Sequence, residues 1–260
     1  MRSILVIPAR MAATRLPGKP LADIHGRPMI AHVLDRAREA GIGPLAVACA
    51  EEEIAEAARA AGARAVLVAD DVPSGTDRVQ RAMKALDPAG EYDVVVNLQG
   101  DAPLTPAWFV EDLVRGLLAD PGADIATPVL RCDGRALNGF LADRRAGRVG
   151  GTTGVFGAGM RGLYFSKEVI PFTAKTYADD AETPVFHHVG VYAYRPAALA
   201  AYPTWPIGPL ETLEGLEQLR FLENGRQVLC VEVQAKGRQF WELNNPSDVP
   251  VIEAMMAEMG

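Results

Sequence analysis

Short apolar runs bounded by turn residues recur along the first half of the chain and predict β-strands. These runs cover residues 4–9, 45–50, 65–69, 93–99 and 124–130. Two segments between them, 29–41 and 51–62, place apolar residues at helical spacing and end at a glycine, which is typical of a capped amphipathic helix. Because strands and helices alternate, the pattern predicts an α/β fold with a mostly parallel, twisted sheet and helices on both of its faces.

The second half of the chain has a less regular pattern. Strands are expected over 162–166, 187–196 and 227–233, and one amphipathic helix over 211–225. The apolar stripe of that helix would consist of Leu213, Leu216, Leu219 and Leu222. The glycine-rich segment 147–162 is expected to be a flexible loop or a hairpin, and 178–184 an exposed loop. Together, the two halves predict a Rossmann-like sheet with a smaller mixed region.

Composition limits the class of protein further. The chain has 260 residues, of which 49% are hydrophobic and 23% charged, and this composition is ordinary for a soluble globular enzyme. Its net charge of −7 argues against a nucleic-acid partner. Its three cysteines lack metal-ligand spacing and are expected to be reduced. We find neither a signal-peptide pattern nor an apolar run of the ~20 residues that span a bilayer. A cytoplasmic protein without a membrane partner is expected.

The segment that follows the first strand, "ILVIPARMAATRLPGKPL", concentrates positive charge. Arg10, Arg15 and Lys19 alternate with prolines and a glycine that restrict the backbone and let it approach a ligand closely. In a parallel sheet, ligands bind beyond the carboxyl ends of the strands. Such a loop can aim cations and backbone N–H groups at a triphosphate. A surface loop with three solvated cations is the alternative, and spacing alone does not decide between them.

A carboxylate and a serine complete the first candidate site. The run "VVVNLQGDAPL" delivers Asp101 at the end of an apolar strand, where a carboxylate suits Mg²⁺ on nucleotide phosphates. A lone aspartate in a turn is more often structural, but the cationic loop at the same edge favours a functional role. Ser74 precedes a helix that begins near Asp77, and it either contacts a base or caps the helix, with capping favoured.

Six blocks that occur in order now identify a family. The blocks "IPAR…TRLPGKPL", "SGTDR", "QGD.P", "LYFS…IPF", "HHVGVYAYR" and "PLE…EQLRFLENG" resemble the 3-deoxy-manno-octulosonate (Kdo) cytidylyltransferases, also called CMP-Kdo synthetases. The resemblance covers residues 3–250. It implies transfer of CMP from CTP to the anomeric hydroxyl group of an acidic sugar, with Mg²⁺ as cofactor, release of pyrophosphate and a homodimeric enzyme of lipopolysaccharide or capsule synthesis.

The resemblance also implies roles for individual residues. Arg10, Arg15 and Lys19 would hold the CTP phosphates, and Asp101 would bind Mg²⁺. The remaining nucleotide-binding residues would be Pro8, Ala9, Ser74, Gly75 and Gln99. The acidic sugar would contact His188, Tyr192, Glu217 and Gln218. We expect one domain over 1–260, with a nucleotide-binding half, 1–130, and a second half, 131–260, that carries the sugar site and the dimer interface.

The chain departs from the family pattern near its C-terminus. In "WELNNPSDV", Asn244 occupies the place of an aspartate that is a metal ligand in the family, so a charge is missing. Glu242, two residues earlier, is a candidate replacement. "ACAEEE", Ala102 and the glycine-rich segment are further departures. The alternatives are therefore a cytidylyltransferase for another acidic acceptor, such as 8-amino-Kdo, another sugar acid or a phosphonate, and a nucleotide-binding homologue without catalysis.

Overall fold

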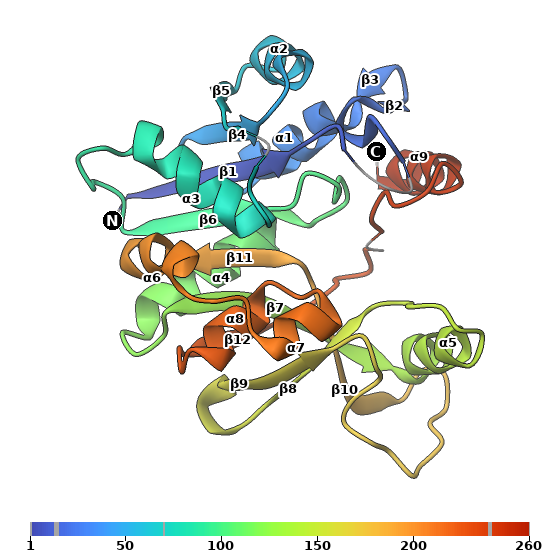
Figure 1. The fold of residues 1–260 in the computed structure, drawn as a ribbon. Coiled ribbons are helices and arrows are strands. Elements are labelled where there is room, and N and C mark those ends of the chain that lie inside the picture. The colour runs from blue at the N-terminus through green and yellow to red at the C-terminus, as the bar shows by residue number, and fades with distance from the viewer. Residues whose placement is uncertain (1, 13–15, 70, 239–240, 260) are drawn as a thin grey trace. The chain divides into compact units, whose positions relative to one another are not determined.

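A computed structural model describes residues 2–12, 16–69, 71–238 and 241–259 (Figure 1). The chain separates into two compact units, which we describe one at a time. Unit 1 comprises Met1–Val114, Ala193–Pro203 and Ala235–Gly260. Unit 2 comprises Arg115–Tyr192 and Thr204–Gln234. The expected division into halves at residue 130 stays a prediction.

Unit 1 contains the parallel sheet that the apolar runs predict. Its strands are β1 (Ser3–Ala9), β4 (Leu45–Cys49), β5 (Arg64–Leu67) and β6 (Val94–Leu98). They lie in the order β5-β4-β1-β6, and every neighbouring pair is parallel. All residues of β1 and β6 are buried, as expected for central strands covered on both faces. The carboxyl ends of the four strands therefore meet at one edge.

Helices flank this sheet and bury the apolar stripes found in the sequence. The helices of unit 1 and its borders are α1 (Met29–Glu39), α2 (Glu52–Ala60), α3 (Gly75–Leu86), α4 (Ala107–Ala119), α6 (Pro196–Ala201) and α9 (Asp248–Met259), with the 3-10 turns η1 (Lys19–Leu21) and η3 (Tyr202–Thr204). In α1, the apolar residues at helical spacing are buried, among them Ile30, Val33, Leu34 and Ala37. A hairpin of β2 (Asp23–Ile24) and β3 (Arg27–Pro28) precedes α1.

A separate apolar cluster holds the C-terminal segment within unit 1. Ile24, Met29, Leu104, Leu243 and Ile252 are all fully buried and pack together. Burying such side chains contributes about 1.5–3 kcal/mol each. The cluster therefore fixes the stretch that carries Asn244 beside the loop that carries Asp101.

Unit 2 contains a mixed sheet. Its strands are β7 (Ile125–Asp133), β8 (Thr152–Phe156), β9 (Gly162–Ser166), β10 (Glu182–His188) and β12 (Val228–Val233), and β11 (Val191–Tyr194) crosses the division between the units. β12 is parallel to β7, whereas β10 is antiparallel to both β7 and β8. β8 and β9 form an antiparallel hairpin around η2 (Ala158–Met160), with α5 (Gly134–Arg145) before it. Of the two alternatives for the glycine-rich segment, the hairpin is confirmed.

The single helix expected over 211–225 is wrong. Two short helices, α7 (Pro209–Glu214) and α8 (Gln218–Glu223), replace it. Gly215 between them has a φ of 62°, a left-handed conformation that ends a helix and that glycine adopts readily. The break disrupts the predicted stripe, so that Leu213 is 81% exposed while Leu219 is fully buried.

Two smaller predictions in unit 2 are also corrected. The strand expected over 187–196 is interrupted by a turn in which the Val191 N–H donates to the Val189 carbonyl oxygen at 2.7 Å. The segment 178–184 is not wholly an exposed loop, because β10 begins at Glu182 and Thr183 is 2% exposed. Within the described part of the chain, we find no helix with both the length and the apolar character that a membrane span requires.

Candidate functional site

The ends of β1 and β6 touch through their backbones. A Cβ atom added to Gly100 would lie 2.7 Å from the Pro8 carbonyl oxygen and 3.7 Å from the Ala9 Cβ. No side chain fits there without displacing the backbone, so a glycine is required between Gln99 and Asp101. The predicted nucleotide-binding residues Pro8 and Ala9 therefore lie directly against the loop that carries the predicted metal ligand.

The ammonium group of Lys19, a predicted phosphate-binding residue, contacts the predicted metal ligands at this edge of the sheet. Lys19 Nζ donates to Asp101 Oδ2 at 2.7 Å and to Asn244 Oδ1 at 3.3 Å. The side chains of Lys19 and Asp101 are 13% and 33% exposed, so the pair is only partly screened by water. Three segments that are far apart in the sequence thus bring one cation and two side-chain oxygens together.

The position of Asn244 depends on contacts of its own segment. The Leu243 N–H donates to the Asp101 carbonyl oxygen at 2.9 Å, and the Asn244 N–H donates to Asp248 Oδ2 at 2.8 Å. Burial acts to raise the pKa of Asp248, but hydrogen bonds, first among them those from the backbone N–H groups of Asn244 and Asn245, hold that pKa below its ordinary value. Asp248 is therefore an ionised anchor for the loop.

Glu242 contacts Asn244. The Asn244 amide Nδ2 lies 3.4 Å from Glu242 Oε2, so the carboxylate lies on the amino side of the amide, while the amide oxygen faces Lys19. Glu242 is therefore placed beside the predicted metal ligand. Its own role as a ligand stays a prediction.

The oxygen atoms of Asp101 and Asn244 fit a divalent cation of the Mg²⁺ type. Both already lie around a positive charge, and carboxylate and amide oxygens are ligands that Mg²⁺ accepts. Among the residues that the structure describes there is no cluster of three or more histidine, cysteine, aspartate or glutamate side chains that could hold a metal. Phosphate and water oxygens would therefore supply the other ligands, as is usual for Mg²⁺.

The cationic loop begins at an exposed arginine and is held by a glutamate. Arg10 follows β1 directly and is exposed, whereas Arg15 lies outside the described residues. The Met11 N–H donates to Glu51 Oε1 at 2.9 Å. Sequence reasoning noted "ACAEEE" only as a departure and missed this contact. A carboxylate two residues after the end of β4 was the available signal, because β4 and β1 are parallel neighbours.

Ser74 caps a helix. Its Oγ accepts from the Asp77 N–H at 3.1 Å and lies 2.6 Å from Asp77 Oδ2, to which it donates. The favoured capping interpretation is therefore confirmed. The contact of Ser74, Gly75 or Gln99 with a nucleotide stays a prediction. Gly75 is the first residue of α3, and the partly buried Gln99 follows β6.

A buried polar chain behind this edge was not predicted. Thr76 Oγ1 and Tyr194 Oη lie 2.8 Å apart, and Asn97 Nδ2 lies 3.5 Å from Tyr194 Oη. Asn97 is fully buried, and its Oδ1 has no hydrogen-bond partner among the described residues. The single amide in the apolar run "VVVNL" could have drawn attention to Asn97, since an amide in a fully buried strand needs polar partners.

Unit 2 brings together three of the four residues assigned to the acidic sugar. The rings of His188 and Tyr192 lie 5.8 Å apart, and Tyr192 Oη donates to Gln218 Oε1 at 3.0 Å. Gln218 is 1% exposed, and its Nε2 is a buried donor without a hydrogen-bond partner among the described residues. Glu217 is the partly exposed residue before α8. Helical periodicity would have placed Gln218 on a polar surface, so its burial follows from the break at Gly215.

Burial keeps both histidines of this region neutral. It lowers the pKa of His188 to about 3, with a smaller effect from His187, and it lowers the pKa of His187 to about 4. His187 packs edge-on against Phe140, with ring centroids 5.2 Å apart. A neutral His188 can donate one hydrogen bond and accept another, but it carries no charge for an anion.

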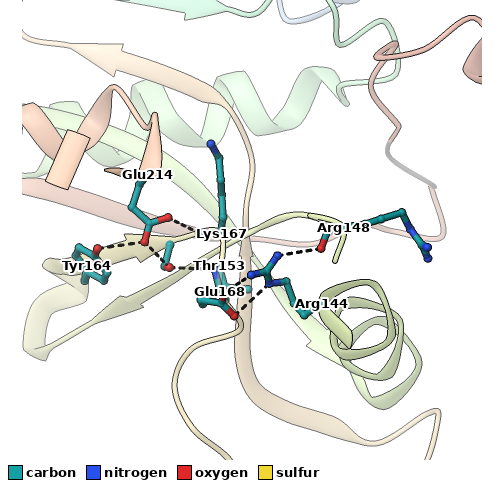
Figure 2. Close-up of polar contacts among 8 residues, drawn as sticks. Arg144, Arg148, Thr153, Tyr164, Lys167, Glu168 and Glu214 are labelled. Atoms are coloured by element: carbon teal, nitrogen blue, oxygen red, sulfur yellow. Dashed lines mark hydrogen bonds and ion pairs between the residues drawn. The ribbon is translucent and has the colours of Figure 1, made fainter. Parts of the chain in front are cut away.

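Glu214 ties the turn before Glu217 and Gln218 to β9 (Figure 2). Its carboxylate accepts from Ser166 Oγ at 2.6 Å, from the Lys167 N–H at 2.9 Å and from Tyr164 Oη at 3.1 Å. Although burial opposes it, these donors hold the pKa of Glu214 below its ordinary value. The α7–α8 turn is therefore anchored by an ionised side chain that is not itself a predicted contact of the ligand.

Figure 2 also shows the neighbouring contacts of β8 and β9. Thr153 Oγ1 donates to the Glu168 carbonyl oxygen at 2.7 Å, and Arg144 pairs with the Glu168 carboxylate through two nitrogens. Arg144 also donates to the Arg148 carbonyl oxygen at 3.0 Å. These contacts connect α5 to the hairpin that follows it.

Comparison with known proteins assigns the class. The family model described as cytidylyltransferase matches residues 4–228. The protein is thus a cytidylyltransferase, an enzyme of the nucleotidyltransferase class. Relatives named 3-deoxy-manno-octulosonate cytidylyltransferase include one from Rhodospirillum centenum, which is 49% identical over 86% of this chain and 83% of its own length. Another, from Maricaulis maris, is 39% identical over 100% of this chain and 99% of its own. The chain belongs to the 3-deoxy-manno-octulosonate cytidylyltransferase family.

Solved structures agree with this assignment. A CMP:2-keto-3-deoxy-manno-octonic acid synthetase complexed with CTP matches with a TM-score of 0.84 and 33% identity over 100% of both chains. A 4-diphosphocytidyl-2C-methyl-D-erythritol synthase from Anaerococcus prevotii matches with a TM-score of 0.62 at 12% identity, which shows a shared fold alone. The predicted fold class and family are therefore confirmed.

Proposed function

We propose that this enzyme transfers CMP from CTP to the anomeric hydroxyl group of Kdo and depends on Mg²⁺. The observation that carries the proposal is the contact of Lys19 with both Asp101 and Asn244. It places a cation of the kind that binds phosphate next to two oxygen atoms that can bind a metal. Support also comes from the names of the relatives and from the solved relative that is complexed with CTP.

The reaction is a direct displacement at phosphorus. The anomeric hydroxyl oxygen attacks the α-phosphorus of CTP, the bond from that phosphorus to the bridging oxygen breaks, pyrophosphate leaves, and the hydroxyl proton passes to solvent. No bond to the enzyme forms, so positioning and charge neutralisation carry the catalysis. Arg10, Arg15 and Lys19 would bind the phosphates and stabilise charge as it moves onto pyrophosphate.

Asp101 and Asn244 would hold the metal. When bound, Mg²⁺ supplies charge neutralisation at the phosphates and lowers the pKa of the attacking hydroxyl group. Lys19 contacts both of these residues, so it would exchange the carboxylate of Asp101 for phosphate oxygens when it binds the nucleotide. Glu242 would compensate for part of the missing charge at Asn244.

His188, Tyr192, Glu217 and Gln218 would contact the acidic sugar. The Gln218 Nε2 group supports this role, because a buried donor without an acceptor costs about 1–3 kcal/mol and an oxygen atom of the sugar can satisfy it. We further propose a homodimer that acts in the cytoplasm in lipopolysaccharide or capsule synthesis. The three described cysteines are free and buried, which suits a reducing compartment.

A related acceptor is the second candidate function. Asn244 in place of a carboxylate favours either another acidic acceptor, such as 8-amino-Kdo, another sugar acid or a phosphonate, or binding of CTP without turnover. Pyrophosphate release by the purified enzyme with CTP and Mg²⁺ tests these possibilities. Kdo-dependent release supports the first proposal, release with another acid alone supports the second, and CTP binding without release from any acceptor overturns both transfer reactions.

A further inference from the structure

Thr127 contacts the imidazole of His188 and two backbone carbonyl groups. Thr127 Oγ1 lies 2.8 Å from His188 Nε2 and also 2.9 Å from the Val191 carbonyl oxygen. Thr127 is fully buried and His188 is 5% exposed, so water does not replace these contacts freely. A hydroxyl group has a single proton and can donate it to only one of these neighbours at full strength.

The carbonyl oxygen of Val191 is the acceptor for that proton. A carbonyl oxygen cannot donate, so without the proton two oxygen atoms would face each other at 2.9 Å in a buried site. The other carbonyl near Thr127, that of Val189, is at 3.4 Å and already accepts the Val191 N–H at 2.7 Å. The Thr127 hydroxyl is therefore a donor to Val191 and an acceptor toward His188.

The tautomer of His188 follows from this direction of the hydrogen bond. Nε2 must donate to Thr127 Oγ1 and therefore carries the proton, while Nδ1 keeps a lone pair and can only accept. Nδ1 has no hydrogen-bond partner among the residues that the structure describes. The imidazole also contacts two aromatic rings, with centroid distances of 4.9 Å to Phe165 and 5.8 Å to Tyr192.

We propose that Thr127 is a positioning residue which fixes His188 as the Nε2–H tautomer, so that Nδ1 accepts a hydrogen bond from a hydroxyl group of the acceptor substrate. The inference rests on the proposed contact between His188 and an acidic sugar. It also assigns different parts of that sugar to different residues. A bare Nδ1 repels a carboxylate but accepts from a hydroxyl group, whereas the Gln218 Nε2 donor suits a carboxylate or other oxygen acceptor. The preferred acceptor therefore carries hydroxyl groups as well as its acid group.

Nitrogen NMR of the ligand-free enzyme tests the tautomer directly. Histidine labelled with ¹⁵N gives separate shifts for protonated and bare ring nitrogens, and the chain has only four histidines to assign. We expect one neutral tautomer for His188, with its proton on Nε2, in the wild type and in Thr127→Ser, which keeps the hydroxyl. In Thr127→Val, which keeps the shape, the hydrogen-bonded Nε2–H signal should be lost. A wild-type proton on Nδ1, or a Thr127→Val spectrum like that of the wild type, overturns the proposal.

Kinetics with the acidic acceptor complete the test. We expect Thr127→Val to raise KM for the acceptor about tenfold, the size of one lost hydrogen bond, with KM for CTP unchanged and Thr127→Ser close to wild type. An equal rise for both substrates would contradict a role through His188. If Thr127→Val does not fold, the wild-type and Thr127→Ser spectra still decide the tautomer. A correct tautomer in an enzyme that accepts no sugar acid would refute the proposed function while leaving the effect of Thr127 on His188 intact.

Discussion

Lys19 Nζ and Asp101 Oδ2 are 2.7 Å apart although 82 positions separate the two residues in the chain. This ion pair joins the residue expected to bind phosphate to the residue expected to bind metal. Each side chain satisfies the charge of the other. We therefore expect that binding of CTP and Mg²⁺ replaces this ion pair with a contact of Lys19 to phosphate and a contact of Asp101 to the metal. If these two roles hold, the pair links nucleotide binding to metal binding.

Replacing the lysine should separate these two events. We expect Lys19→Met to lower kcat/KM for CTP by roughly 10²–10³-fold, because a cation at the phosphates is lost. The same variant should bind Mn²⁺ more tightly than wild type without CTP, because Asp101 loses its competing cation; electron paramagnetic resonance measures this binding. Lys84→Met, in the last turn of α3 and exposed, is the matched control and should change neither quantity. Weaker Mn²⁺ binding by Lys19→Met would contradict the exchange.

Asn244 offers a test of the missing carboxylate. Asn244→Asp places a second negative charge next to Lys19 and Asp101, so it should lower the Mg²⁺ concentration needed for half-maximal rate several-fold. Titration of Mg²⁺ at saturating CTP measures this. Asn138→Asp adds the same charge to an exposed position of α5 and should have no effect. Glu242→Gln should raise the Mg²⁺ concentration needed for half-maximal rate, and an unchanged concentration would remove Glu242 from the site.

Gly100 tests the contact between the two edge segments. Gly100→Ala puts a Cβ 2.7 Å from the Pro8 carbonyl oxygen, so we expect a loss of about 1–3 kcal/mol in unfolding free energy and weaker CTP binding. Gly139→Ala is the control, since its Cβ would meet nothing within 4 Å on an exposed helix position. It should be neutral or stabilise by up to about 1 kcal/mol. Urea unfolding and CTP titration compare the two, and equal stability would show that the close approach is absent.

Glu214 predicts a pH dependence of stability. Its folded pKa lies below the ordinary value of 4.5, so its ionised form stabilises the folded state fully above about pH 4.5, and this contribution is lost as the pH falls through the lower folded pKa. Glu214→Gln should therefore unfold at lower urea concentration than wild type at pH 7, with the difference shrinking below pH 4.5. The exposed Glu56→Gln serves as control. A difference that grows in acid would contradict the assignment.

The parallel core and one edge of the site could be predicted because the signals are local. The apolar run of β1 and the stripe of α1 report burial directly, and both lie where the pattern places them. The strand order then brings the ends of β1 and β6 together, so Pro8 and Asp101 could be assigned to one edge from the fold class alone.

Other features could not be predicted because they depend on tertiary contacts. The helical stripe of Leu213 and Leu219 was plausible locally, but the left-handed Gly215 changed which residues face inward. The contacts of Glu51 with Met11 and of Thr127 with His188 join distant segments, and no periodicity reports them. From the sequence alone, these residues can be recognised as able to form hydrogen bonds, but their partners cannot be identified.

Analysis of the reaction product tests the central claim most directly. The purified enzyme is incubated with CTP, Mg²⁺ and Kdo, and ³¹P NMR with mass spectrometry identifies the phosphorus compounds that form. We predict equal amounts of pyrophosphate and a CMP diester with the mass of CMP-Kdo, and none of either when Asp101→Asn replaces the wild type. Bound CTP that persists unchanged with Kdo, or a CMP diester formed only with another acid, would contradict the assignment of Kdo as the acceptor.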